Sequence, residues 1–397
     1  MSGADPHAAP APTGQRGWLH RISIRGFRNL VHVDIELPAE GLVLVGDNGE
    51  GKTNFLEAIH YLQILRSFRG ALDRELVTFG AAGFHVAAEL RDAPVSEVAV
   101  GFDRAARRKK VTLDGAEPAR LSGALGAFPA VIFSPQDAVL VSGAPSVRRR
   151  FLDVVLALTS RRYLVALQRY RAALVRRNAA LREAGGLASG GGGGDSRERR
   201  ASLEQRAEVW EPALVESGAV LWRERHEWVE VHGQRYAELC AAIGERGVPR
   251  LRYAGCVDDA DDAEQALRDA FERKRPLDLR RGLTHVGPHR DDLELSLDDR
   301  ELRTYGSAGQ QRTAAMALRL LEAATLRAHA EREPVVLLDD PFAELDARRA
   351  TRILELIDTE GRGQTILAVP RASDIPDGLT RLARWRISAG ALTREGA

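Results

Sequence analysis

The stretch Gly41-Leu-Val-Leu-Val-Gly46-Asp-Asn-Gly-Glu-Gly51-Lys52-Thr53-Asn-Phe-Leu-Glu-Ala-Ile59 decides the fold of this 397-residue chain. Its apolar run at 42–45 predicts a buried parallel strand, and the apolar residues at 55, 56 and 59 follow at helical spacing. Between them, residues 46–53 match G-x-x-x-x-G-K-T in the strand–loop–helix context that this motif requires. Glycines in such a loop let backbone N–H groups surround phosphates, and the helix start adds the positive end of its dipole. The stretch therefore predicts a phosphate-binding loop in an α/β fold.

Each residue type in this loop has an expected role. Lys52 reaches the β and γ phosphates and is one of two expected catalytic residues, and the Thr53 hydroxyl is expected to bind Mg²⁺. Only four of the 57 basic residues are lysines, so a lysine here stands out against an arginine-rich background. The alternative is a glycine-rich turn that matches by chance. The expected nucleotide-binding residues of the loop are Gly46, Asp47, Asn48, Gly49, Glu50, Gly51, Lys52, Thr53 and Asn54.

A second apolar run, residues 334–338, ends in two carboxylates, Asp339 and Asp340. A carboxylate at the end of a strand beside a phosphate loop can hold Mg²⁺, which is the role expected of Asp339. Asp340 is the second expected catalytic residue, because it would polarise or position the attacking water. The alternative is a buried strand that ends in solvated acids.

A third feature, Ser307-Ala-Gly309-Gln310-Gln311, opens a long helix with apolar residues at 316, 320 and 321. Taken alone it predicts an ordinary N-cap. A helix N-terminus of this kind also binds phosphate readily, and the two preceding motifs favour that second interpretation.

Together these motifs resemble the RecF family, bacterial recombination-repair ATPases of the ABC/SMC head superfamily. The resemblance extends from about residue 19 to about residue 386. It includes Ile24-Arg-Gly-Phe-Arg-Asn-Leu30, Phe133-Ser-Pro-Gln-Asp137, residues 143–153, 177–181 and 284–293, and Leu338-Asp-Asp-Pro-Phe-Ala-Glu-Leu-Asp346.

The resemblance implies an α/β ABC/SMC-like P-loop ATPase head, a mixed sheet with helices, and an inserted, mainly helical second lobe. The predicted divisions are a disordered tail at 1–17, the first head part with the P-loop at 18–147, the helical lobe at 148–280 with a flexible glycine loop at 185–196, and the second head part with the signature, Walker B and D-loop motifs at 281–397. Residues at seven-residue spacing favour a coiled-coil-like helical hairpin in the lobe: Leu167, Leu174 and Leu181; Leu214, Leu221 and Trp228; Val215, Trp222, Val229 and Tyr236.

The resemblance also implies the cofactors ATP and Mg²⁺ and an ATP-dependent homodimer in which two heads enclose two ATP molecules. Ser307, Gly309 and Gln310 of one head would touch the γ-phosphate held by the other. Gln136 follows a strand where a glutamine that senses Mg²⁺ and water would fall. Pro370-Arg371 stands after a late strand, where many ABC ATPases have a switch histidine, so slow hydrolysis is expected.

Residues 148–183 contain ten arginines against two acids, and two tyrosines interleave with them. Such a helical arm suits contacts with DNA phosphates, although a solvated helix face enriched in arginine by coding bias is the alternative. The candidate DNA-binding residues are Arg148, Arg149, Arg150, Arg161, Arg162, Arg169, Arg176 and Arg177.

The family implies action on single-stranded, gapped or junction DNA, with RecR and RecO as partners in loading RecA, and a link to the SOS response. Two cysteines and the lack of an apolar run of about 20 residues exclude a disulfide framework and a membrane span, so a cytoplasmic location is expected. The alternatives are another SMC-like recombination ATPase, a transporter ATPase subunit, and a scaffold with a degenerate P-loop. His285 and His289 could form a metal site, but their Gly-Pro spacing favours a structural role.

Overall fold

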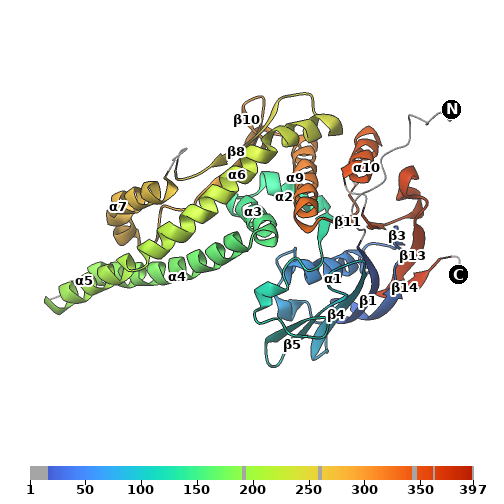
Figure 1. Cartoon of the computed structure of the whole chain (residues 1–397), viewed down its shortest axis with the longest axis horizontal. Coiled ribbons are helices and arrows are strands. Elements are labelled where there is room, and N and C mark those ends of the chain that lie inside the picture. The colour runs from blue at the N-terminus through green and yellow to red at the C-terminus, as the bar shows by residue number, and fades with distance from the viewer. Residues whose placement is uncertain (1–16, 190–193, 258–261, 342–346, 361–362, 396–397) are drawn as a thin grey trace, which may run out of the picture. The chain divides into compact units, whose positions relative to one another are not determined.

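The computed structural model describes residues 17–189, 194–257, 262–341, 347–360 and 363–395 (Figure 1). They form two compact units, each built from separate stretches of the chain. The first unit contains residues up to 133, residues 323–341 and residues from 356 onward. The second contains residues 134–322 and 342–355. The predicted tail at 1–17 lies outside the described residues, apart from Gly17.

The first unit is built on two sheets. The antiparallel sheet has the order β2-β1-β4-β5-β6, with strands β1 (Trp18–Phe27), β2 (Leu30–Glu36), β4 (Gly83–Arg91), β5 (Glu97–Asp103) and β6 (Arg108–Leu113). The second sheet has the order β14-β13-β3-β12-β11-β7, with strands β3 (Gly41–Val45), β7 (Ala130–Phe133), β11 (Val335–Asp339), β12 (Thr365–Val369), β13 (Ala383–Ser388) and β14 (Ala391–Arg394). All its neighbours pair in parallel except β13 and β14.

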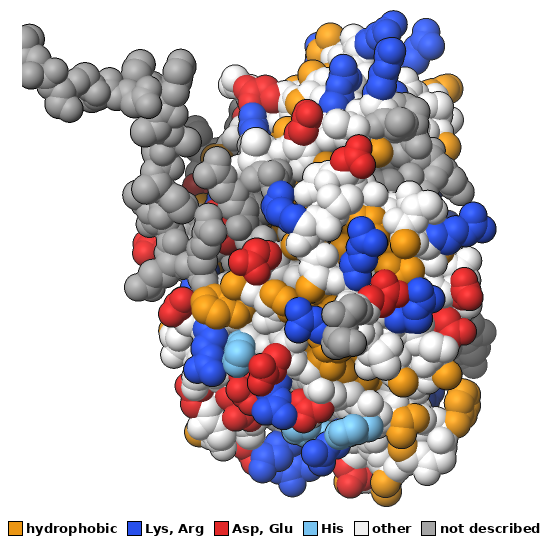
Figure 2. Space-filling model, turned by 90° about the vertical axis from the view of Figure 1, so that its right-hand side faces the viewer, with side chains coloured by type: hydrophobic (Ala, Val, Ile, Leu, Met, Phe, Trp, Pro, Cys, Tyr) orange, Lys and Arg blue, Asp and Glu red, His pale blue; other side chains and the backbone are white. Residues whose placement is uncertain are grey.

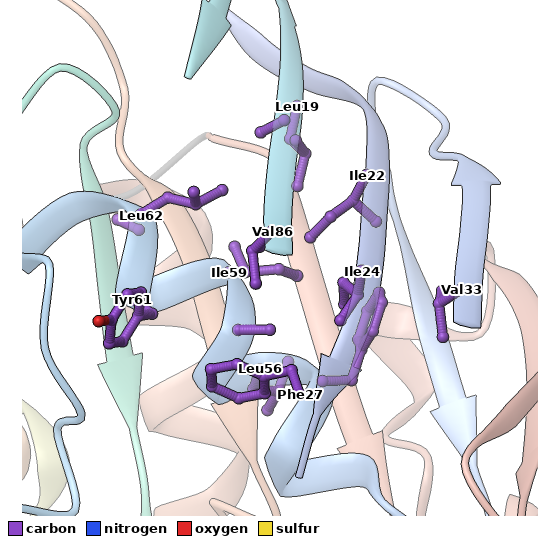
Figure 3. Packing of buried hydrophobic residues seen from close by; sticks show 14 of the residues in the cluster. Leu19, Ile22, Ile24, Phe27, Val33, Leu56, Ile59, Tyr61, Leu62 and Val86 are labelled. Carbon is purple, nitrogen blue, oxygen red and sulfur yellow. The ribbon is translucent and has the colours of Figure 1, made fainter. Parts of the chain in front are cut away.

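The central strands of the second sheet are buried at every position, as expected of a parallel sheet covered on both faces. Helix α1 (Lys52–Ile64) contacts β1, β4 and β5 of one sheet and β7, β11 and β12 of the other. Figure 3 shows Leu56 and Ile59 of α1 with Ile22 and Ile24 of β1 in one apolar cluster, and all four are fully buried. Burying each such side chain contributes roughly 1.5–3 kcal/mol. This core fixes the helix that begins at the predicted phosphate loop.

The second unit is mainly helical. Its helices are α2 (Val139–Ser142), α3 (Pro145–Thr159), α4 (Arg161–Ser189), α5 (Gly194–Glu208), α6 (Glu211–Ile243), α7 (Ala263–Arg281) and α8 (Leu302–Tyr305), and its small sheet has the order β10 (Arg300–Glu301), β9 (Asp292–Leu297), β8 (Pro249–Ala254). Helices α4 and α6 pack together, and Leu181, Leu214 and Leu221 of the predicted seam are fully buried. The predicted helical hairpin is therefore confirmed.

Two helices cross the boundary between the units in sequence. Residues 308–322 of α9 (Ala308–Ala330) belong to the second unit and the rest to the first, and α10 (Ala347–Glu360) divides at residue 356. Among the described helices, no stretch combines the length and the hydropathy needed to span a lipid bilayer.

Parts of the predicted glycine loop at 185–196 are helical. Helix α4 continues to Ser189 and α5 begins at Gly194, and residues 190–193 lie outside the described part of the chain. A glycine inside a helix costs about 1 kcal/mol relative to alanine, which a helix continuing from a packed hairpin tolerates. The helical unit also extends beyond the predicted lobe, 148–280, at both ends. At the C-terminal end, β9 pairs with β8 and Asp292 binds Arg148 of α3. At the N-terminal end, Arg148 donates to the backbone oxygens of Val141 and Gly143.

Candidate functional site

The predicted phosphate loop connects β3 to α1, and its backbone geometry explains why it contains glycines. Gly51 precedes α1 with φ 118°, in the left-handed region that favours glycine. A Cβ atom on Gly46 would lie 2.5 Å from the carbonyl oxygen of Ile387 in β13, closer than real Cβ contacts allow. The loop therefore packs tightly against β13 before it turns into the helix.

The Lys52 ammonium group lies inside this loop. Its Nζ atom donates hydrogen bonds to the backbone oxygens of Gly46 at 2.6 Å and Asp47 at 2.9 Å. Burial lowers the pKa of Lys52, and the carboxylates of Asp339 and Asp340 oppose that shift. A phosphate oxygen carries negative charge, so it attracts the ammonium group more strongly than a neutral carbonyl oxygen does. Phosphate oxygens in the loop would thus be stronger partners for this cation than the carbonyl oxygens are.

The two predicted Mg²⁺ ligands meet at the start of α1 and the end of β11. The Thr53 hydroxyl donates to the carboxylate of Asp339, at 2.9 Å to Oδ1 and 3.0 Å to Oδ2. Burial raises the pKa of Asp339, so a nearby cation would favour its ionised form. Mg²⁺ binds hard oxygen ligands, commonly one or two protein groups with phosphate and water oxygens completing the shell. These two side chains fit that requirement.

Asp340 stands next to this pair, at the carboxyl end of β11. Its backbone N–H donates to the carbonyl oxygen of Ala368 in β12 at 2.9 Å, and its φ is 45°. Aspartate and asparagine adopt this left-handed conformation more easily than most other residues. Because β3, β12 and β11 are parallel neighbours, Asp340 lies at the same edge of the sheet as the phosphate loop.

Sequence patterns do not predict the side-chain contacts that hold the loop, although Asn54 is among the expected nucleotide-binding residues. The Asn29 side chain, in the turn between β1 and β2, donates to the backbone oxygen of Glu50 at 3.0 Å and accepts from Asn54 at 2.8 Å. Arg69 in turn donates to the Asn54 side chain at 3.3 Å, and its charge acts on Asp339 against the effect of burial. No spacing rule reveals these contacts, because they join segments that only the folded topology brings together.

A fully buried carboxylate on α1 links the same segments. Glu57 accepts hydrogen bonds from Arg28 at 3.0 and 3.1 Å and from the Ser67 hydroxyl at 2.5 Å, and Arg69 lies 3.7 Å away. A buried charge is tolerated when it is paired and hydrogen-bonded in this way. Glu57 therefore fixes the segments before and after α1 to the helix.

The predicted signature segment forms the start of α9 in the second unit. The Ser307 hydroxyl accepts from the backbone N–H of Gln310 at 3.3 Å, and the Gln310 side chain accepts from the N–H of Ser307 at 2.9 Å. This reciprocal pair is a capping box, so the N-cap interpretation of Ser307 is confirmed. Ser307 remains exposed, and Gly309 follows within the first turn. Contact with the nucleotide of a second head stays a prediction.

Gln136 also belongs to the second unit, in a short turn at 135–138 that follows β7. The Ser134 hydroxyl accepts from its backbone N–H at 3.3 Å, and its side chain is exposed. The adjacent Asp137 is buried and pairs with Arg319 of α9 at 2.7 Å. The turn is thus firmly held, and the sensing role of Gln136 remains a prediction.

Comparison with known proteins decides the family. Residues 18–375 match the model of the RecF/RecN/SMC N terminal domain family. The DNA replication and repair protein RecF of Ligilactobacillus salivarius is 31% identical over 388 residues, which cover 96% of this chain and 98% of that protein. The chain belongs to the RecF family.

Solved structures agree with this membership. A structure of the recombination mediator protein RecF with ATP, from the RecFOR pathway, has a TM-score of 0.82 and 27% identity, and the match covers 98% of this chain and 100% of that one. The Smc head domain of Pyrococcus furiosus, bound to the C-terminal domain of ScpA, has a TM-score of 0.52 and 17% identity over 95% of this chain and 96% of that one. The predicted ABC/SMC-like head fold is confirmed.

Two of the eight candidate DNA-binding arginines of this RecF-family chain are buried in ion pairs within the protein. Arg148 is 3% exposed and forms two hydrogen bonds with Asp292, at 2.7 and 2.8 Å. Arg177 is fully buried and binds Asp278 at 2.7 Å and Glu211 at 2.9 Å. Neither side chain is available to a DNA phosphate, so the structure removes both from the predicted set.

The other candidates lie nearer the surface. Arg149 is half-buried and donates to the backbone oxygen of Asp291 at 2.6 Å. The remaining five are exposed: Arg150, Arg161, Arg162, Arg169 and Arg176. Three of these, at 162, 169 and 176, recur every seven residues and so form a stripe along α4, which we call the arginine stripe.

The two histidines of the RecF-like segment 284–293, His285 and His289, form hydrogen bonds that stabilise this segment. His285 Nδ1 pairs with Asp278 at 2.8 Å. His289 Nδ1 lies 2.6 Å from the Tyr170 hydroxyl and its Nε2 lies 3.1 Å from the backbone oxygen of Thr284. Burial lowers the pKa of His289 to about 4, so the neutral ring can donate through Nε2 and accept through Nδ1. In the described part of the chain, no three His, Cys, Asp or Glu side chains gather as a metal site would require.

Proposed function

We propose that this chain is an ATP-dependent DNA-binding protein of recombinational repair and replication-fork recovery. The observation that carries the proposal is the convergence of Lys52, Thr53 and Asp339, with Asp340 adjacent, at one edge of the parallel sheet. The full-length match to proteins named DNA replication and repair protein RecF supports the biological role. The similar RecF structure with ATP supports the choice of nucleotide.

The chain's own residues suggest how ATP acts as a switch. The loop's N–H groups and Lys52 bind the phosphates, and Thr53 and Asp339 would hold Mg²⁺, which neutralises phosphate charge when bound. Asp340 accepts a hydrogen bond from the attacking water and orients it. Ser307, Gly309 and Gln310 of a second copy would approach the γ-phosphate, so ATP would join two heads and hydrolysis would release them. We propose a weak, DNA-stimulated ATPase, because Pro370-Arg371 supplies no switch histidine after β12.

The proposed DNA substrates are single-stranded, gapped or junction DNA. The proposed partners are RecR and RecO, with which the chain would load RecA. We place this activity in the cytoplasm and propose that it contributes to SOS induction. The RecFOR pathway named for the similar structure supports the partners. The second candidate is another SMC-like recombination ATPase, favoured by the Smc head fold. A pull-down tests these candidates: a RecF protein should retain RecR together with gapped DNA, and retention of DNA without RecR would favour the second candidate. Retention of membrane permease components would instead indicate a transporter subunit.

The two-head proposal predicts that Ser307→Arg binds ATP as a monomer. The substitution leaves the phosphate loop intact but adds bulk and charge where a second head's γ-phosphate must approach. Light scattering with ATP should give the dimer mass for the parental chain and the monomer mass for the variant, at equal ATP occupancy. Lys52→Ala serves as the comparison, since it should lose ATP binding itself. A Ser307→Arg protein that still dimerises would contradict the two-head arrangement.

The arginine stripe predicts steep dependence of DNA affinity on salt. On the face drawn in Figure 2, basic and acidic side chains are interspersed. The net charge of the chain is +1, so the proposed phosphate contacts depend on a local surplus of arginine, as in residues 148–183. Replacing Arg162, Arg169 and Arg176 with glutamine should reduce the slope of log affinity against log salt by about 0.9 per lost duplex phosphate contact.

The matched control replaces three exposed arginines of the small sheet, Arg250, Arg252 and Arg300, with glutamine. It removes the same net charge and should leave the slope near the parental value. Equal slopes for both triple variants would show that the stripe makes no specific contribution.

A further inference from the structure

The turn between β13 and β14, residues 388–391, forms hydrogen bonds with one acidic residue of the phosphate loop, Glu50. The backbone N–H of Ala389 donates to the Glu50 carboxylate, and the N–H of Gly390 donates to the Glu50 backbone oxygen at 2.9 Å. Both the side chain and the main chain of Glu50 are therefore bound by a turn more than 330 residues away in sequence.

The fit between this turn and the loop is close. Gly390 has φ 80°, and a Cβ atom there would lie 2.2 Å from the backbone oxygen of Asn29. The Asn29 side chain also donates to the Glu50 backbone oxygen, at 3.0 Å. Strand β13 also reaches the start of the loop, where Ile387 leaves no room for a side chain on Gly46. The C-terminal hairpin thus contacts the loop at its first glycine and at its middle.

The loop needs such support because of its composition. Glu50 lies between Gly49 with φ 91° and Gly51 with φ 118°. Glycine loses more conformational freedom on folding than any other residue, so a loop rich in it does not hold one shape without external contacts. A loop that is already in its binding conformation loses less entropy when a ligand arrives.

We infer that Glu50 and the Ala389–Gly390 turn form a latch that holds the phosphate loop in its nucleotide-binding shape. Glu50 is thereby a positioning residue, with its carboxylate directed to the protein and not to the nucleotide. The inference rests on the proposed ATP-binding function, and it adds the chain's last hairpin to the nucleotide site.

The test uses the full-length chain and two measurements, the dissociation constant for ATP and hydrogen–deuterium exchange of the peptide that contains Ala389 and Gly390 without nucleotide. Glu50→Ala should speed exchange of that peptide and weaken ATP binding about tenfold, the factor expected for one hydrogen bond to a charged group. Glu50→Gln should rescue both, since its amide oxygen can still accept from Ala389.

A second variant changes the turn of the latch in place of Glu50. Gly390→Ala places a methyl group against Asn29 and should weaken ATP binding to a similar extent. Gly378→Ala is its matched control, because nothing lies within 4 Å of a Cβ atom at Gly378. The control should bind ATP like the parental chain.

The outcomes separate the latch from the proposed function. Unchanged exchange in Glu50→Ala would overturn the latch contact, and faster exchange with parental ATP affinity would overturn its positioning role. If Glu50→Gln fails to rescue and the melting temperature falls equally in both variants, Glu50 is merely structural and the inference is wrong. A parental chain that binds no ATP would refute the proposed function itself.

Discussion

An Asp340→Asn variant should hydrolyse ATP about 30- to 150-fold more slowly than the parental chain. This factor corresponds to a loss of about 2–3 kcal/mol of transition-state stabilisation, at 1.36 kcal/mol per decade of rate. The backbone should not change, because asparagine tolerates the left-handed conformation at φ 45° and keeps the N–H bond to Ala368. Thr53 and Asp339 stay in place, so ATP should still bind and the two-head dimer should last longer.

Single-turnover hydrolysis and light scattering on the same samples measure both effects. Asp374→Asn is a suitable control, since it makes the same change at an exposed turn. It should hydrolyse ATP at the parental rate. An Asp340→Asn protein with the parental rate would remove Asp340 from the catalytic residues and leave the assignment of Asp339 unaffected.

Replacing Arg177 with methionine should destabilise the second unit by about 3–5 kcal/mol, the usual cost of removing one partner of a buried ion pair. The fully buried guanidinium binds Asp278 and Glu211 and lies over the ring of Phe271, with 5.3 Å from Cζ to the ring centroid. Methionine fills similar volume but leaves the buried Asp278 carboxylate without its arginine, and it leaves Glu211 paired with Arg275 alone.

Urea unfolding followed by tryptophan fluorescence measures this loss, because Trp210, Trp222 and Trp228 all belong to the second unit. Arg176→Met is the matched control at the neighbouring, exposed position, where the guanidinium stacks on Trp210. It should cost less than about 1 kcal/mol, as most surface changes do. Equal losses at 176 and 177 would contradict the structural role of Arg177.

The parts of the site that are contiguous in sequence could be predicted. The loop from Gly46 to Thr53 and the strand that ends at Asp339 carry their own signals, because strand, glycines and polar residues follow one another directly. The Asn29–Glu50 contact and the pairing around Glu57 could not be predicted, since each depends on which strands become neighbours. Long-range polar contacts leave no periodic trace in a single sequence.

The heptad positions of the arginines on α4 distinguish buried from exposed members. Tyr163, Tyr170 and Arg177 recur every seven residues and are all fully or almost fully buried. Arg162, Arg169 and Arg176, one position earlier, are exposed. The tyrosines therefore mark the buried face of the helix, and heptad position would have separated Arg177 from the stripe. The surplus of arginine over acidic residues in 148–183 does not by itself distinguish the buried face of α4 from the exposed face.

The pairing of β3 with β12 has a consequence for how the chain is made. Residues 41–45 acquire their hydrogen-bonded neighbour only when residues 365–369 have been synthesised. At roughly 5–20 residues per second, the ribosome needs about 16–64 s to cover that interval. During that time the apolar strand Leu42–Val45 has no sheet to enter, although most of the second unit has already emerged. A nascent chain arrested before residue 365 should thus expose this segment to chaperones and proteases.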